Sequence, residues 1–173
     1  MTKISFGAVV LLLLRLNGHA TDYDRISNVL AATLPSLALG TTLYLHDRNG
    51  TKDFAYSMGA NLAATAALKY TIDATRPNGQ KHSFPSGHTS VSFQSAAFVH
   101  RRYGWQYAAG MYAGAALVAY CRVQGRKHYV RDVVAGALLG VGLGYAMTRY
   151  YHGFAVRAGT SKTLLGLTLS KRW

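Results

Sequence analysis

The sequence predicts an all-α protein, a compact antiparallel bundle of about five helices that follows an N-terminal signal segment. Half of the 173 residues are hydrophobic, and apolar and small residues recur in long blocks with little strict alternation. Polar, turn-forming sequences separate these blocks. Because the separating sequences are short, neighbouring helices are expected to run antiparallel, and the length suits a single domain.

Residues 1–20 have the features of an export signal. Lys3 gives a positively charged start, an apolar run follows at 4–14, and Gly18 and Ala20 are small residues at a cleavage point. The run is shorter than the roughly 20 residues that a bilayer span needs, although an uncleaved anchor is the alternative. We expect an exported protein, periplasmic if the source is a Gram-negative bacterium, that is soluble or associated with a membrane surface. An embedded bundle is the competing interpretation.

The helical domain is expected to cover residues 21–152. Gly136, Gly140 and Gly144 recur every four residues, as do Gly110 and Gly114. Such stripes let helix backbones approach closely, so we assign these glycines to packing. The helices are predicted at 26–45, 53–75, 86–103, 105–122 and 129–151, with turns near 47–50, 76–79, 103–104 and 124–125.

The tail, residues 153–173, changes character. Its leucines are mixed with Thr, Gly and Ser, and it ends in Lys171, Arg172 and Trp173. Part of the tail alternates like a strand, but one strand cannot form a sheet alone. We therefore expect a basic tail of uncertain structure, either flexible or forming a surface edge.

The charge balance is strongly basic. Nineteen Lys and Arg stand against six acidic residues, giving a net charge of +13, and all six acids are Asp. The absence of Glu excludes metal cages and acid/base pairs built from Glu. The charge predicts an anionic partner, such as a phosphate, a lipid headgroup or nucleic acid. Cys121 is the only cysteine, so no internal disulfide can form.

Three stretches carry chemically useful residues, and the first contains Lys69 and Arg76. Their seven-residue separation is close to two helical turns, so both cations lie on one face, and Pro77 ends that helix. A solvated basic face would show the same spacing.

The second stretch contains Ser86, Gly87 and His88. Ser86 suits an N-cap, and Gly87 leaves backbone N–H groups open, so an anion could bind at this helix start with His88 beside it. An ordinary helix start with an incidental histidine is the alternative.

The third stretch contains Arg122, His128 and Asp132. If a helix already runs through His128, the four-residue step places Asp132 on the same face, where its carboxylate can accept the imidazole N–H. The other ring nitrogen is then free to attack. A purely structural hydrogen bond between the two remains the alternative.

Together the three stretches supply the parts of a phosphoryl-transfer site: fixed cations, backbone donors, a supported nucleophile and an acid. In their order and spacing, Lys-x6-Arg-Pro, Pro-Ser-Gly-His and Cys-Arg-x5-His-x3-Asp resemble the signature of the type 2 phosphatidic acid phosphatase and vanadium haloperoxidase superfamily. The resemblance covers residues 69–132. Cys121 stands where that family usually has Ser, which is expected to alter local packing or remove one hydrogen bond.

The resemblance implies a role for each residue. His128 would be the nucleophile that forms a phosphohistidine, Asp132 would orient it, and His88 would protonate the leaving oxygen. The side chains of Lys69, Arg76 and Arg122 would hold the phosphate. The backbone at Ser86 and Gly87 would hold it as well. From the residues alone, His88 could equally be a base or an anion ligand.

The leading hypothesis is therefore an acid or lipid phosphatase that hydrolyses a phosphomonoester or diphosphate through a phosphohistidine, without a metal or other cofactor. The alternatives are a vanadate-dependent haloperoxidase and a non-enzymatic binder of anionic membranes or nucleic acid. The export signal argues against nucleic acid as a partner. A Cys-x5-Arg phosphatase loop at Cys121 is excluded because Lys127 occupies the position of the Arg, and an aspartyl pair at Asp22 and Asp24 lacks a preceding strand. Further basic residues are expected around the site: Lys81, Arg101, Arg102, Arg126, Lys127 and Arg131.

Overall fold

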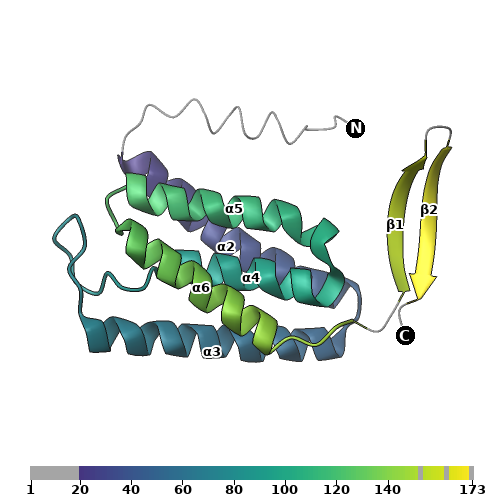
Figure 1. Ribbon diagram of the computed structural model, residues 1–173, viewed down its shortest axis with the longest axis horizontal. Helices are drawn as coiled ribbons and strands as arrows, with labels where there is room; N and C mark the ends of the chain where they lie inside the picture. Colours follow the sequence, from purple (N-terminus) through teal and green to yellow (C-terminus); the bar gives the residue numbers. More distant parts are fainter. Residues whose placement is uncertain (1–19, 152–153, 162–163, 172–173) are drawn as a thin grey trace.

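The computed structural model describes residues 20–151, 154–161 and 164–171. The signal segment expected at 1–20 lies outside these residues, apart from Ala20. The predicted all-α bundle is confirmed: the described residues form five helices, followed by two short strands (Figure 1). The elements are α2 (Ala20–Tyr44), α3 (Arg48–Ile72), α4 (Gly87–Tyr103), α5 (Trp105–Gln124), α6 (Val130–Ala146), β1 (Phe154–Ser161) and β2 (Leu164–Lys171).

Two helices begin earlier than the sequence predicts. α2 begins at Ala20, inside the expected signal segment, and α3 begins at Arg48. The reason for the early start of α3 is a cap: the Asp47 carboxylate accepts the Gly50 N–H at 2.9 Å. The sequence 47–50, predicted as a turn, is thus the capped first turn of a helix.

The central helix of the bundle is α4, which packs against each of the other four helices. The closest approach is between α4 and α6. A Cβ atom at Gly136, Gly140 or Gly144 would come within 3.0 Å of atoms of α4 or of its N-cap, including the backbone oxygens of Ser86 and Ser90. The predicted packing role is confirmed for these three glycines.

The glycine stripe of α5 packs only in part. A Cβ at Gly114 would lie 3.3 Å from the Leu34 side chain, whereas one at Gly110 would meet nothing within 4 Å. The packing role predicted for Gly110 is therefore wrong, because that position faces outward.

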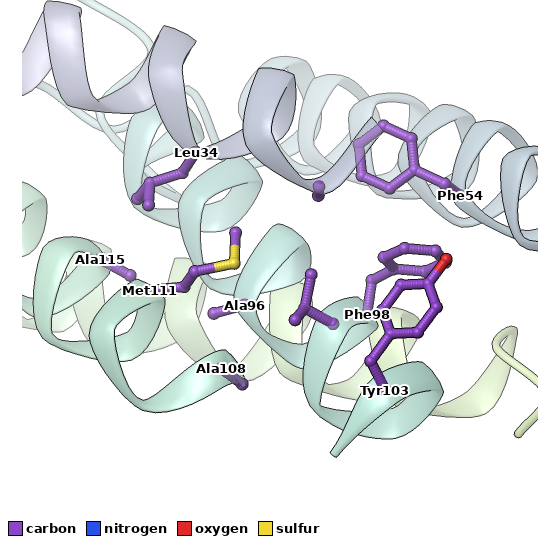
Figure 2. Packing of buried hydrophobic residues seen from close by; sticks show 10 residues of the cluster. Leu34, Phe54, Ala96, Phe98, Tyr103, Ala108, Met111 and Ala115 are labelled. Atoms are coloured by element: carbon purple, nitrogen blue, oxygen red, sulfur yellow. The ribbon is translucent and has the colours of Figure 1, made fainter. Parts of the chain in front are cut away.

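The hydrophobic cluster lies between α2, α3, α4 and α5 (Figure 2). Phe54 and Phe98 meet edge to face with ring centroids 5.0 Å apart, and Tyr103 packs on Phe98 at 6.1 Å. Leu34 and Met111 add to the cluster. These side chains anchor the end of the bundle where α3 begins and α4 ends.

A buried ion network closes this same end. The Arg102 guanidinium donates to the Asp47 carboxylate through Nε at 2.7 Å and Nη2 at 2.6 Å, and Arg149 donates to Asp53 at 2.8 Å. Arg101 stacks on the Tyr150 ring, 4.0 Å from its centroid. Placing Arg101 and Arg102 around the site was wrong. They are at the C-terminal end of α4, about 20 Å along the helix from His88 at 1.5 Å per residue.

Polar side chains fill the contact between α3 and α4. The Ser90 hydroxyl donates to the Asn61 amide oxygen at 2.6 Å and lies 3.1 Å from the Thr65 hydroxyl, and Gln94 donates to Ser57 at 2.7 Å. Among the described residues, buried polar or charged residues outnumber buried hydrophobic ones. The two helices are thus joined by hydrogen bonds instead of a large apolar seam.

The tail contains two strands. β1 and β2 pair antiparallel, in a register that runs from Phe154 opposite Lys171 to Ser161 opposite Leu164. The sequence predicts one strand-like stretch here, within a tail that is either flexible or a surface edge. A hairpin forms because the second strand supplies the backbone partners that one strand alone would lack.

Candidate active site

The five helices bring chemically active residues to the end of the bundle opposite the ion network. α2 and α4 begin at this end, α3 and α5 finish there, and α6 starts from it (Figure 1, left). The loop between α3 and α4 lies at the same end. It connects the first signature stretch, at the end of α3, to the second, at the start of α4. The antiparallel arrangement therefore gathers segments that are far apart in the sequence.

His128 and Asp132 are both buried, with 2% and 0% of their side chains exposed. The distance from His128 Nδ1 to Asp132 Oδ2 is 3.6 Å. α6 begins at Val130, so no helix runs through His128, contrary to the condition set in the sequence analysis. Asp132 is instead fixed at the start of α6, where its Oδ2 accepts the Tyr129 N–H at 3.0 Å.

The three predicted cations surround this pair, and each is held differently. Arg122 is 4% exposed, and its Nη1 donates to the Asp24 carboxylate at 2.7 Å. Lys69 Nζ donates to the His82 carbonyl at 2.8 Å. The Nε groups of Arg76 and Arg122 are buried and have no hydrogen-bond partner among the described residues. Unpartnered buried donors of this kind are suited to an anion.

The electrostatics of the two histidines confirm that the groups share one region. Burial, followed by the charges of Arg122, Lys69 and Arg76, lowers the pKa of His128. Burial and the charge of Arg122 lower the pKa of His88 to about 4, with Arg76 and Lys69 adding to the effect. Both imidazoles are therefore neutral at neutral pH, which leaves a ring nitrogen of each with a free lone pair.

Lys69 responds to the same surroundings. Burial, then the nearby charge of Arg76, lowers the pKa of Lys69 to about 8, while Asp132 acts in the opposite direction. The ammonium group is thus still charged at neutral pH but is close to losing its proton. The charges of Lys69, Arg76 and Arg122 thus act on both histidines, in agreement with the position of the three stretches at one end of the bundle.

The start of α4 is placed by contacts with α6. The Ser86 N–H donates to the Asp132 carbonyl at 2.9 Å, and the Ser86 hydroxyl accepts from Thr89 at 3.0 Å. Ser86 occupies the N-cap position without making a side-chain cap bond. The amide of Ser86 is therefore engaged, and the amides that can face an anion belong to the first turn, beginning at Gly87.

Two residues of this region escaped the sequence analysis. Asp24, considered only as a nucleophile, pairs with Arg122 and lies 3.4 Å from Lys127 Nζ. Ser83 is fully buried and its hydroxyl donates to Asp132 Oδ2. Asp24 could not be found from spacing because 98 residues separate it from Arg122. Ser83 gave only a weak signal, its position three residues before Ser86.

Cys121 is buried, and burial raises the pKa of its thiol, so it packs as a small apolar side chain beside Arg122. Of the further basic residues, Lys127 pairs with Asp24, and Arg131 Nε lies 3.6 Å from Asp132 Oδ1. Within the described ranges, no group of three or more His, Cys, Asp or Glu residues is arranged to hold a metal ion.

The fold and the site together define a class: an all-helical protein in which a histidine–aspartate pair is surrounded by three cations. The chain belongs to the PAP2 superfamily, whose sequence model matches residues 50–155. This confirms the resemblance to the type 2 phosphatidic acid phosphatases. Asp24, on α2, lies outside the matched residues.

Two known proteins are similar to the chain. It is 36% identical over 143 residues to the lipid A 1-phosphatase of Porphyromonas gingivalis. The match covers 76% of this chain and 32% of that protein. The chain thus spans about a third of the length of this curated relative. The crystal structure of LpxE from Aquifex aeolicus matches with a TM-score of 0.57 at 20% identity, over 77% of this chain and 96% of that chain. It shares the fold.

Proposed function

We propose that this chain is a phosphatase that hydrolyses a lipid phosphomonoester through a phosphohistidine on His128. The observation that carries the proposal is the environment of His128: a buried, neutral imidazole beside Asp132, surrounded by the charges of Lys69, Arg76 and Arg122. Such a group is a nucleophile placed where a phosphate dianion is attracted.

Binding of the phosphate group uses the donors that the structure leaves open. The buried Nε groups of Arg76 and Arg122 would donate to the phosphate oxygens, and two of the three ammonium protons of Lys69 remain beside its bond to His82. The amides of the first turn of α4, beginning at Gly87, would add backbone donors. These groups would also stabilise the charge on the equatorial oxygens in the transition state.

In the first chemical step, Nε2 of His128 attacks phosphorus in line with the leaving oxygen. The P–N bond forms while the P–O bond to the substrate breaks, and His88 gives its proton to the departing oxygen. In the second step, His88 accepts a proton from water, whose oxygen attacks phosphorus and breaks the P–N bond. Inorganic phosphate leaves, His128 is again neutral, and His88 releases its proton to solvent as the dianion departs.

His88 can act as the acid only after substrate has bound. In the free protein, burial and the site cations hold the pKa of His88 at about 4, so it carries no proton at neutral pH. A bound phosphate dianion offsets those cations and raises the pKa of His88 toward neutrality, so that His88 takes up a proton from solvent. The acid is thus generated by the substrate itself, which links proton transfer to phosphate binding.

A lipid substrate is supported by the relative and by the surface. The relative's name specifies a lipid phosphatase, acting on lipid A. On α6, Val130, Val134 and Leu138 are 63%, 50% and 70% exposed, and their four-residue spacing makes one continuous apolar face. α2 is long and apolar enough to cross a membrane, and only 28% of its apolar stretch is buried. We therefore place the protein at a membrane.

Exposed aromatic residues fit the same placement. Tyr70 and Tyr120 are 73% and 52% exposed near the active end of the bundle, and Tyr44 and Trp105 are 84% and 57% exposed at the other end. Tyr and Trp are enriched where membrane meets water. The site would then open near one membrane surface, where a lipid headgroup can reach it. A carbonate wash of membranes containing the chain tests this placement: release of the chain without detergent would contradict attachment through apolar faces.

The activity is tested by measuring phosphate release from micellar lipids that carry one phosphate. The panel includes a glycolipid 1-phosphate, a phosphatidic acid and a lipid diphosphate, assayed with and without vanadate. We expect hydrolysis of a monoester, inhibition by vanadate, and loss of turnover in His128→Ala. The matched control is His46→Ala, a histidine in the connection between α2 and α3 at the opposite end. Equal activity of His128→Ala and His46→Ala would exclude the proposed nucleophile.

A further inference from the structure

Ser83 is a buried nucleophilic group to which the mechanism above gives no part. It lies in the loop between α3 and α4, none of its surface is exposed, and its N–H donates to the Ala74 carbonyl at 2.7 Å. This backbone bond fixes the position of Ser83 within the loop. The side chain is therefore held independently of whatever its hydroxyl contacts.

The Ser83 hydroxyl lies between the two members of the histidine–aspartate pair. Its Oγ donates to Asp132 Oδ2 and is 3.5 Å from His128 Nδ1. The direct distance from Nδ1 to Oδ2 is 3.6 Å, longer than an ordinary N–H···O hydrogen bond. The Nδ1 atom of the imidazole thus faces an oxygen pair made by Asp132 and Ser83 together.

The contacts of Asp132 show why a second holder is needed. Its Oδ2 accepts from the Tyr129 N–H and from Ser83, whereas its Oδ1 is buried without a hydrogen-bond partner among the described residues. Oδ1 lies 3.6 Å from Nε of Arg131, whose side chain is 68% exposed, and such a solvated ion pair restrains rotation about the Cβ–Cγ bond only weakly. Two donors that reach the same oxygen from different directions restrict that rotation and keep Oδ2 turned toward the imidazole.

We propose that Ser83 is a positioning residue for His128, an inference that rests on the proposed function. Its hydroxyl holds Asp132 so that Oδ2 faces Nδ1, and its own oxygen offers Nδ1–H a second acceptor. The proton is thereby kept on Nδ1, and the lone pair on Nε2 points toward phosphorus. When the P–N bond forms, the imidazole becomes positively charged, and the aligned carboxylate stabilises that charge.

The test uses two substitutions and a matched control. Ser83→Ala removes the hydroxyl, and Ser83→Thr restores it. Ser95→Ala is the control, because Ser95 is equally buried but donates only to the Val91 carbonyl within α4. Each protein is labelled with 15N-histidine, and NMR reads the tautomer and the titration of His128. Phosphate release gives kcat and KM, and circular dichroism confirms the fold.

We expect the Nδ1–H tautomer of His128 in the wild type and a mixture of tautomers in Ser83→Ala. On the scale of one lost positioning contact, kcat should fall about 10- to 100-fold with a much smaller change in KM. Ser83→Thr should recover most of both properties, and Ser95→Ala should leave them unchanged. A wild-type tautomer and an unchanged kcat in Ser83→Ala would overturn the proposal.

Two further outcomes remain informative. If Ser83→Ala does not fold, Ser83→Cys keeps the side-chain size with a weaker donor, and an unchanged His128 tautomer in that variant would overturn the positioning role. If the wild type releases no phosphate from any lipid, the proposed function fails. The NMR comparison then still decides the Ser83 assignment, because the tautomer is read without turnover.

Discussion

Replacing Lys69 by Arg tests the electrostatics of the site through its pH dependence. Lys69 has a pKa lowered from 10.5 to about 8 by burial and by the charges of Arg76 and Arg122. The lowered pKa means that the cation is present below pH 8 and is lost as the pH rises through that value. Because a phosphate dianion binds to the charged form, kcat/KM should fall on the alkaline side.

The size of the effect follows from that pKa. At that pKa half of Lys69 is charged, and one pH unit above it about a tenth, so kcat/KM should fall about fivefold between pH 8 and pH 9 and about tenfold more by pH 10. An Arg at this position stays charged above pH 12. The Lys69→Arg variant should therefore lose the fall near pH 8, even if its geometry lowers the plateau.

The assay measures phosphate release from a phosphomonoester between pH 5 and pH 10, using subsaturating substrate so that the rate reports kcat/KM. Lys52→Arg, on the exposed surface at the other end of α3, is the matched control and should retain the wild-type profile. An alkaline fall at the same pH in Lys69→Arg and in the wild type would refute the reasoning, since Lys69 would then not be the titrating group.

Three other predictions address separate parts of the structure. Asp24→Asn removes a carboxylate 2.7 Å from Arg122 Nη1 and so removes repulsion toward a bound dianion. We expect vanadate to inhibit this variant about tenfold more tightly, about 1.4 kcal/mol, and weaker inhibition would contradict the repulsion. Gly140→Ala places a Cβ against the backbone of α4 and should lower the melting temperature by several degrees. Gly142→Ala, whose Cβ would meet nothing within 4 Å, should keep or raise the melting temperature, and equal effects of the two substitutions would argue against the close α4–α6 contact. His88→Ala should slow release of an alkyl alcohol far more than release of a nitrophenol, which needs no proton, and equal losses for both substrates would exclude His88 as the acid.

Much of the fold was predictable because local signals set it. Blocks of apolar and small residues marked the helices, and the four-residue spacing of Gly136, Gly140 and Gly144 marked the tightest helix contact. The early start of α3 was missed because the cap at Asp47 looks like a turn in the sequence. Arg102 was misplaced because its partners, Asp47 and Asp53, lie about 50 residues away, and sequence spacing does not reveal such contacts.

Part of the site was predictable, because several of its residues stand at fixed spacings within short stretches of the sequence. Lys69 and Arg76 were recognised by their spacing before Pro77, and His88 by its position after Gly87. The supporting shell was not predictable, because it is a property of three-dimensional packing. Asp24 reaches Arg122 from α2, and Ser83 reaches Asp132 from a loop, without any periodic relation between the paired residues.

The most direct test of the account is to trap the phosphorylated intermediate. The wild-type chain is mixed with a lipid phosphomonoester, quenched in alkali to preserve phosphohistidine, and analysed by mass spectrometry of its peptides. We predict one phosphate on His128 in the wild type and none on any residue in His128→Ala. Phosphate on another residue, or turnover in His128→Ala, would contradict the central claim that His128 is the nucleophile.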